Sequence, residues 1–140
     1  MSSKVKYLSS ILTPVSLGEL IDKITILEIK QIHMTGVKLK NVDKELKLLK
    51  QILQDKNLEI DINLINNLKE VNKNLWEIED NIRIKESNQQ FDKAFIQLAR
   101  SVYKENDKRA SIKKEINQKY NSELVEENHI ITIKLSHILF

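Results

Sequence analysis

The sequence predicts an all-α protein: an antiparallel bundle of four to five helices, built as a single domain over residues 1–140. Composition is the first observation, because the 140 residues include only 2 Gly and 1 Pro, whereas 41% are hydrophobic and 31% are charged. Few turn-forming residues and many Leu, Ile, Lys and Glu favour long helices over a many-stranded β fold. Periodicity is the second observation, since apolar residues recur every three or four positions along most of the chain.

The first helix is expected from about Leu17 to Thr35. It follows a short leader, residues 1–15, which contains the only proline. Ser16 and Glu19 have the spacing of a capping box, in which a hydroxyl and a carboxylate satisfy backbone N–H groups at a helix start. Gly36 is well suited to the position just after the helix, where a left-handed conformation is common.

Two further helices are expected in the middle of the chain. The second covers roughly Val42 to Gln54, and residues 55–62 lack helical periodicity and are expected to cross one end of the bundle. Asp61 or Asn63 can cap the third helix, from about Leu64 to Glu86. Its apolar residues keep a coiled-coil repeat over nearly three heptads: Leu64, Leu68, Val71, Leu75, Ile78 and Ile82.

The fourth helix begins near Phe91. It either continues through residues 104–110 or breaks near Asn106 and restarts towards Tyr120. The tail, residues 129–140, alternates apolar and polar side chains as a strand does, so a short β pair formed by the termini is an additional option.

Charged side chains on the predicted helix faces are the main functional signal. At 100° per residue, Glu28 lies about 20° from Leu17, within the apolar arc of the first helix, whereas Glu19 and Asp22 point away from it. An unpaired buried carboxylate costs several kcal/mol, so such a group persists only when it is paired or ligand-bound. We therefore expect Glu28 to be buried within hydrogen-bonding reach of a base, with three candidates: Arg83, Arg109 and Lys113.

Polar residues of the later helices flank the same kind of apolar stripe. Together with Glu28 they give the candidate binding residues Glu28, Asn72, Trp76, Glu79, Arg83, Asn106, Arg109 and Lys113. One interpretation is a structural ion-pair network that fixes helix register. The other is a polar pocket whose Arg and Lys bind an anionic small molecule, with Glu28 or Glu79 as acid or base.

Several classes of site are disfavoured. Cysteine is absent and the three His residues lack ligand spacing, so we expect no zinc or iron site. Glu19 and Asp22, like Glu77 and Asp80, have the E-x-x-D spacing of all-helical nucleoside-triphosphate pyrophosphatases. A Mg²⁺ cofactor would follow only from that weak similarity, because the E-x-x-E partner is missing.

Partners and location are constrained by charge and hydropathy. The formal charge of +3 is spread over 23 basic and 20 acidic residues, so we expect no specific nucleic-acid binding. No apolar run approaches the roughly 20 residues of a membrane span, and the N-terminus lacks a secretory signal, so a cytoplasmic protein is expected. The heptad stripe could also support a homo-oligomer.

Four blocks carry a resemblance to a known family: "PVSLGELIDKITILEIK", "VNKNLWEIEDNIR", "FIQLARSVYKENDKRASIKKEIN" and "SELVEEN". They resemble domain of unknown function 6165, a family of small bacterial and phage proteins. The resemblance implies a single helical domain but no catalytic residue. The functional hypotheses are therefore an anionic-metabolite or nucleotide binding protein, enzymatic or not, and alternatively a non-enzymatic helical adaptor or self-association module.

Overall fold

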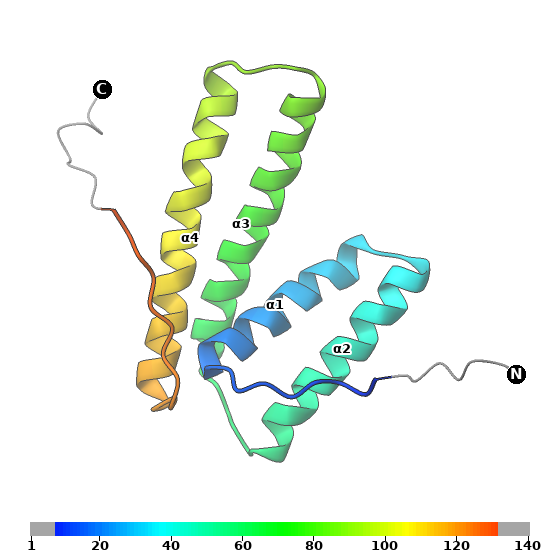
Figure 1. The fold of residues 1–140 in the computed structure, drawn as a ribbon, viewed down its shortest axis with the longest axis vertical. Helices are drawn as coiled ribbons and strands as arrows, with labels where there is room; N and C mark the ends of the chain where they lie inside the picture. The colour runs from blue at the N-terminus through cyan, green and yellow to red at the C-terminus, as the bar shows by residue number, and fades with distance from the viewer. Residues whose placement is uncertain (1–7, 132–140) are drawn as a thin grey trace, which may run out of the picture.

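The structure is a computed structural model that describes residues 8–131. It contains four helices: α1 (Leu17–His33), α2 (Gly36–Asp55), α3 (Ile62–Ser87) and α4 (Lys93–Lys119). They form two helical hairpins, α1–α2 and α3–α4, which pack against each other (Figure 1). The predicted all-α class is confirmed. None of these helices is long and apolar enough to cross a membrane.

The helix boundaries differ from the predicted ones mainly around Gly36. This glycine has a φ of 63° and is the first residue of α2, whereas Met34 closes α1. Helix α4 is continuous through residues 104–110. No strand is present in residues 8–131, and residues 132–140, on which most of the proposed β pair depends, lie outside the described residues.

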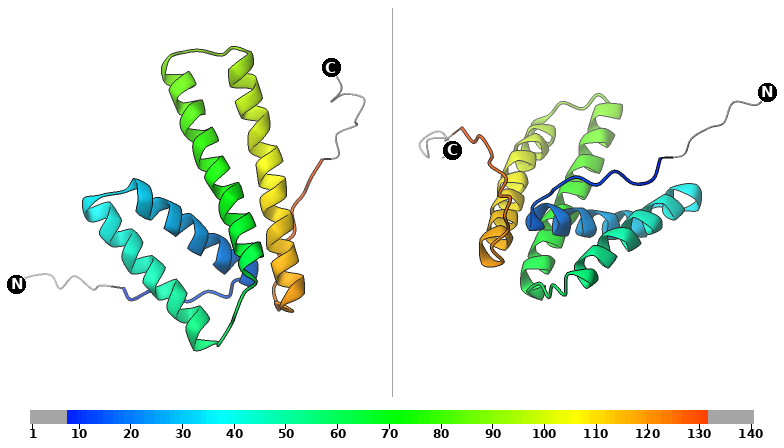
Figure 2. Two further views of the ribbon diagram at one scale, coloured as in Figure 1. Left: turned by 180° about the vertical axis from the view of Figure 1, so that it is seen from behind. Right: turned by 60° about the horizontal axis from the view of Figure 1, so that its bottom comes forward.

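Three helices end in the same kind of turn. Asn57, Gln89 and Asn121 follow α2, α3 and α4 with φ near 50°, the left-handed conformation. In each turn the next N–H donates to a carbonyl five residues earlier, from Leu58 to Leu53, Gln90 to Lys85 and Ser122 to Asn117. This pattern is the Schellman motif, here without glycine. After α4 it reverses the chain, so that residues 122–131 run back along α4 (Figure 2).

Helix α1 packs against all three other helices and is covered on two sides. Towards α2 it contributes to one core cluster: Leu20, Ile24, Leu27, Val42 and Leu46. Towards α3 and α4 it contributes to a second: Ile21, Leu64, Leu68 and Ile116. The two clusters together leave only a narrow strip of α1 facing solvent.

The α3–α4 hairpin extends well beyond α1 and α2 (Figure 1). At the end of α1, the His33 ring stacks on Trp76 of this hairpin, with centroids 4.8 Å apart. Beyond it lies the part that we call the outer hairpin, residues 77–103. No residue of the outer hairpin is buried.

Candidate functional site

The start of α1 is held by the end of α4 and the chain that follows it. The first four N–H groups of a helix have no partner inside the helix. Three of them find a side-chain oxygen here: Leu17 N donates to Ser122 Oγ (3.1 Å), Gly18 N to Asn117 Oδ1 (2.7 Å) and Glu19 N to Ser16 Oγ (3.0 Å). Leu20 N then makes the first i→i−4 bond, to Ser16 O (3.1 Å). The predicted N-cap role of Ser16 is confirmed.

One turn further along α1, Asp22 forms the centre of a charged group that we call the acid–base cluster: Glu19, Asp22, Arg109, Lys113 and Glu126. The Asp22 side chain is only 1% exposed. Arg109 donates to both of its oxygens, from Nε at 2.9 Å and from the terminal nitrogen at 2.5 Å. Asn72 of α3 donates to Asp22 Oδ1 at 3.0 Å and to Thr25 Oγ1 at 2.9 Å. A bidentate pair of this kind fixes the relative position of α1 and α4.

Lys113 joins α1 to the chain after α4. Its Nζ lies 2.6 Å from Glu19 Oε2 and 2.7 Å from Glu126 Oε2. Glu126 also accepts a hydrogen bond from the Ser16 hydroxyl, which in turn caps α1. The glutamate of the predicted capping box thus pairs with Lys113, and only the hydroxyl half of the motif forms.

The ionisation of the cluster follows from these contacts. The hydrogen bond to Asp22 raises the pKa of the Arg109 guanidinium above its ordinary value. Burial works to lower the pKa of Lys113, but hydrogen bonds to Glu126 and Glu19 outweigh it and raise that pKa. For Glu126, burial opposes ionisation, whereas Lys113 and Ser16 lower its pKa to about 2. Arg109, Lys113 and Glu126 are therefore charged at neutral pH.

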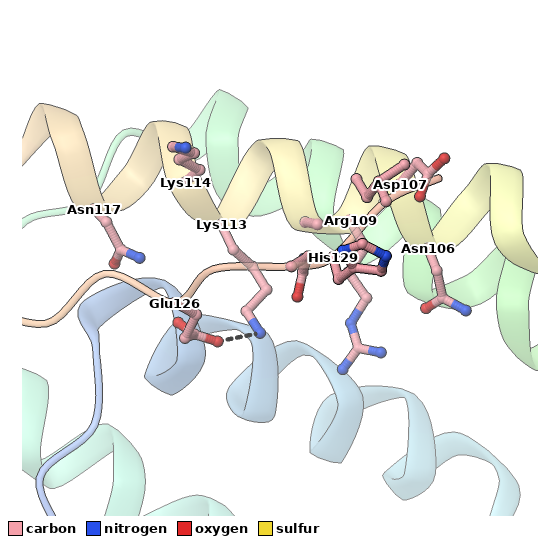
Figure 3. Close-up of a pocket in the computed structure, with 11 residues that line it drawn as sticks. Asn106, Asp107, Arg109, Lys113, Lys114, Asn117, Glu126 and His129 are labelled. Atoms are coloured by element: carbon pink, nitrogen blue, oxygen red, sulfur yellow. Dashed lines mark ion pairs between the residues drawn. The ribbon is translucent and has the colours of Figure 1, made fainter. Parts of the chain in front are cut away.

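A groove of about 400 Å³ opens beside the cluster, between α4 and the segment that runs back along it (Figure 3). Asn106, Arg109, Lys113 and Asn117 line it from α4, and Glu126 and His129 from the returning segment. Each Arg and Lys side chain that lines the groove is paired with a carboxylate. Arg109 pairs with Asp22, Lys113 pairs with Glu19 and Glu126, and Lys114 lies 3.7 Å from Glu127.

Three of the candidate residues named from the sequence meet in this region. Asn72 and Arg109 both contact Asp22, and Lys113 lies beside them. Asn106 lines the groove but is exposed.

The other candidates lie elsewhere, and the prediction for Glu28 is wrong. Glu28 is 25% exposed and lies 3.7 Å from both Lys50 and Lys69, not beside the predicted bases. Trp76 stacks on His33. Glu79 and Arg83 are exposed on the outer hairpin, seven and eleven residues after Asn72 along α3.

Asp22 is the main residue that sequence reasoning missed, because it was expected to face solvent. A helix covered by neighbours on two sides has a buried arc much wider than one apolar stripe. Gly18, Thr25 and Ile29 lie about 80–120° from Leu17 and are all buried, which marks a second packed face next to Asp22. The small or β-branched character of these three residues was the available signal.

The four acids with E-x-x-D spacing do not come together as a site for Mg²⁺. Glu19 and Asp22 each face a base, and Glu77 and Asp80 lie on the outer hairpin. Within residues 8–131, no group of three or more His, Cys, Asp or Glu side chains is arranged to hold a metal ion.

The fold and the cluster together define a protein of two packed helical hairpins with an internal ion-pair network. A family model for a family of unknown function, DUF6165, matches residues 12–136, and the chain belongs to this family. The resemblance seen in the sequence blocks is thereby confirmed, and it extends into the tail. No curated protein and no solved structure matches the chain.

Proposed function

We propose that this chain is a non-enzymatic helical interaction module. In this proposal the acid–base cluster is structural, and the outer hairpin is the surface that binds a partner protein. The observation that carries the proposal is a contrast within one hairpin. The inner half of α3–α4 is packed against α1, whereas no residue of the outer half is buried.

The cluster fits a structural role because its charges are already satisfied. Asp22 accepts from Arg109 and Asn72, and Lys113 is shared by two carboxylates. In residues 8–131 no buried side-chain oxygen or nitrogen lacks a hydrogen bond. An anionic ligand would have to displace carboxylates from these bases, which makes the cluster a poor receptor for anions.

The outer hairpin fits a binding role because it carries large apolar side chains that nothing in residues 8–131 covers. Large hydrophobic residues exposed there include Ile84, Phe91 and Ile96. Two helices in contact can bury only the line between them, and each helix then needs a further neighbour to cover the rest of its apolar arc. A partner helix or hairpin would supply that neighbour.

Site-specific photo-crosslinking in the native host tests the proposal. A photoreactive residue replaces Ile96 in the outer hairpin, and in a matched control it replaces Leu48 of α2. The two side chains are similarly exposed, at 53% and 51%. We expect one defined protein adduct at position 96 and none at position 48. Equal labelling at the two positions, or no adduct at position 96, would contradict the proposal.

A second candidate function is binding of a small ligand with oxygen acceptors in the groove. Asn117 is almost fully buried and lines the groove, and its Oδ1 accepts from Gly18 N. Since Oδ1 is engaged in this way, the amide nitrogen is the group of Asn117 that can donate to a ligand in the groove. A carboxylate or phosphate oxygen could accept from it.

Thermal denaturation with inorganic phosphate, a nucleotide or a dicarboxylate tests this second function. Any ligand of the native state must raise the melting temperature. Asn117→Asp keeps an acceptor for Gly18 and removes the amide donor, so the increase should disappear in that variant. No increase in the wild-type protein with any of the three probes would exclude oxygen-rich anions as ligands.

A further inference from the structure

The stripe of α3 that forms the core continues into the outer hairpin. Leu64, Leu68 and Val71 are buried where α1 covers them. The same heptad positions further along, Ile78 and Ile82, are only half-buried, past the stack of His33 on Trp76. The sequence pattern of a covered helix thus persists beyond the part of α3 that α1 covers.

The side of α3 that α1 occupies can be followed outwards by counting residues. Asn72 and Trp76 both contact α1, through Asp22 or Thr25 and through His33. At 100° per residue, Glu79 and Arg83 fall within about 20° of the arc between Asn72 and Trp76. Both are exposed, and neither has a hydrogen bond or ion pair in residues 8–131.

Helix α4 contributes apolar side chains to the same side. Arg109 and Lys113 face α1, through Asp22 and Glu19. Phe95 and Val102 lie within about 40° of these two residues by the same count, but on the outer turns of α4. The outer hairpin therefore presents an apolar strip from α4 beside an acid and a base from α3, on the side that α1 covers further in.

We propose that this face of the outer hairpin binds the same face of a second copy of the chain. The inference rests on the proposed interaction function and names its partner. Glu79 and Arg83 are four residues apart and opposite in charge, so they are self-complementary about a two-fold axis between them. In an isologous contact each residue i meets residue j of the partner, and j meets i. Glu79 of each copy then faces Arg83 of the other, with the two α3 helices antiparallel.

This arrangement closes the outer hairpins into a four-helix bundle. Phe95 and Val102 of both copies lie in its interior, and the two Glu–Arg pairs lie on its edge. Bundles of four helices bury such stripes in this way. A foreign partner would need to supply both the apolar strip and a matching pair of charges, which a second copy has by symmetry.

Charge reversal tests the pairing. Glu79→Arg makes residue 79 of each copy a second base that faces Arg83 of the other copy. Arg83→Glu makes residue 83 of each copy a second acid that faces Glu79 of the other copy. Each single variant should weaken dimerisation at least tenfold in sedimentation equilibrium. The double variant Glu79→Arg with Arg83→Glu restores opposite charges and should dimerise again. An equimolar mixture of the two single variants should form heterodimers, because their charges are complementary.

Glu77→Arg is the matched control, since Glu77 is an exposed acid of the same helix about 160° away from Glu79 by residue count. It should dimerise like the wild-type protein. Thermal melting of every variant checks that the monomer remains folded. A strictly monomeric wild-type chain at high concentration, or single variants that dimerise as strongly as the wild type, would overturn the proposal.

The crosslinking experiment separates this inference from the function beneath it. If the chain is monomeric and position 96 crosslinks to a different protein, the outer hairpin binds a partner other than a second copy. If the chain is monomeric and position 96 gives no adduct, both proposals fail. A dimer that responds to the charge reversals supports both. Ile96 lies about 100° from Phe95 by residue count, outside the proposed dimer face, so a photoreactive residue at position 95 is the one that should crosslink to a second copy.

Discussion

The carboxylate of Asp22 is surrounded by polar groups from two other helices. Arg109 and Asn72 reach it from α4 and α3, and the side chain is 1% exposed. Asp22→Asn keeps the shape but leaves the Arg109 guanidinium facing an amide. Removing one partner of a buried pair costs about 3–5 kcal/mol, and Arg109 keeps 30% exposure, so we expect a loss of about 3 kcal/mol. Urea denaturation of the variant measures it.

Glu28→Gln is the control on the same helix. Glu28 keeps 25% exposure and lies 3.7 Å from Lys50 and Lys69, so its charge interacts across partly solvated space. Loose pairs of this kind contribute up to about 1 kcal/mol. If Asp22→Asn cost no more than Glu28→Gln, the acid–base cluster would not be the structural centre described above.

These two acids also mark the limit of residue-level prediction. Counting at 100° per residue placed Glu28 within the apolar arc of α1, which is correct. The count could not show that Glu28 lies between α2 and α3, where Lys50 and Lys69 are its neighbours. It placed Asp22 outside that arc, which is also correct. The arc was assumed to be the only buried face, and a helix with three neighbours violates that assumption.

At the scale of a helix, Gly18 determines how closely α1 approaches α4. A β-carbon at this position would lie 2.5 Å from the Lys113 carbonyl oxygen and 3.0 Å from Asn117 Oδ1. The carbonyl belongs to the backbone of α4 and cannot turn aside. Alanine stabilises most helix positions relative to glycine by roughly 0.5–1 kcal/mol. Here the overlap should reverse the sign, and overpacking typically costs about 1–3 kcal/mol.

The melting temperature of Gly18→Ala measures this effect. Gly36→Ala is informative beside it, because a β-carbon there has no atom within 4 Å but the φ is 63°. Its cost, about 1–2 kcal/mol, should come from backbone strain alone. Gly18→Ala should also push α1 away from α4 and so weaken the Lys113–Glu19 ion pair, whereas Gly36→Ala should not. The coupling energy of that pair, measured by a double-mutant cycle in each background, detects the difference. A Gly18→Ala protein as stable as the wild type would show that the α1–α4 contact can relax.

Helices themselves were the most predictable elements. Three of the four starts lie within two residues of the predicted positions, since hydroxyls and carboxylates such as Ser16 and Asp61 cap them as expected. The start of α2 was placed six residues late, at Val42, because the first turns after Gly36 expose Val37 and alternate Lys with Leu, which obscures the apolar stripe.

At the scale of the whole molecule, the sequence predicted four to five helices, of which the structure has four in residues 8–131, but not how the hairpins meet. Heptad repeats on α3 fit equally with an internal core and with an outer seam. The structure uses them for both purposes, with Leu68 buried and Ile82 half-exposed. The boundary between the buried and the half-exposed part of the α3 stripe depends on the length of α1, which ends at His33 beside Trp76 while α3 continues to Ser87. Its position follows from the way the two hairpins cross, which the contacts of Asp22 and Gly18 set and which the sequence pattern does not contain.

The segment after α4 connects α4 to the start of α1 through Glu126. This carboxylate binds Lys113 of α4 and the Ser16 hydroxyl that caps α1, across 110 positions of sequence. Its pKa is lowered from 4.5 to about 2. A carboxyl group with a lowered folded-state pKa stabilises the native state fully above its unfolded pKa. The contribution is lost as pH falls from about 4.5 to about 2.

Glu126→Gln should therefore lower the unfolding free energy at neutral pH and flatten its decline across that acid range. The Glu126 side chain is 39% exposed, so solvent screening should leave a difference of about 1 kcal/mol between the two proteins. Urea denaturation at steps from neutral pH down to 2 measures it, and the two curves should converge at the acid end. Glu127→Gln is the control, because Glu127 is 76% exposed and 3.7 Å from Lys114, and its curve should follow the wild type. Parallel curves for Glu126→Gln and the wild type would mean that the segment after α4 does not hold α1 and α4 together.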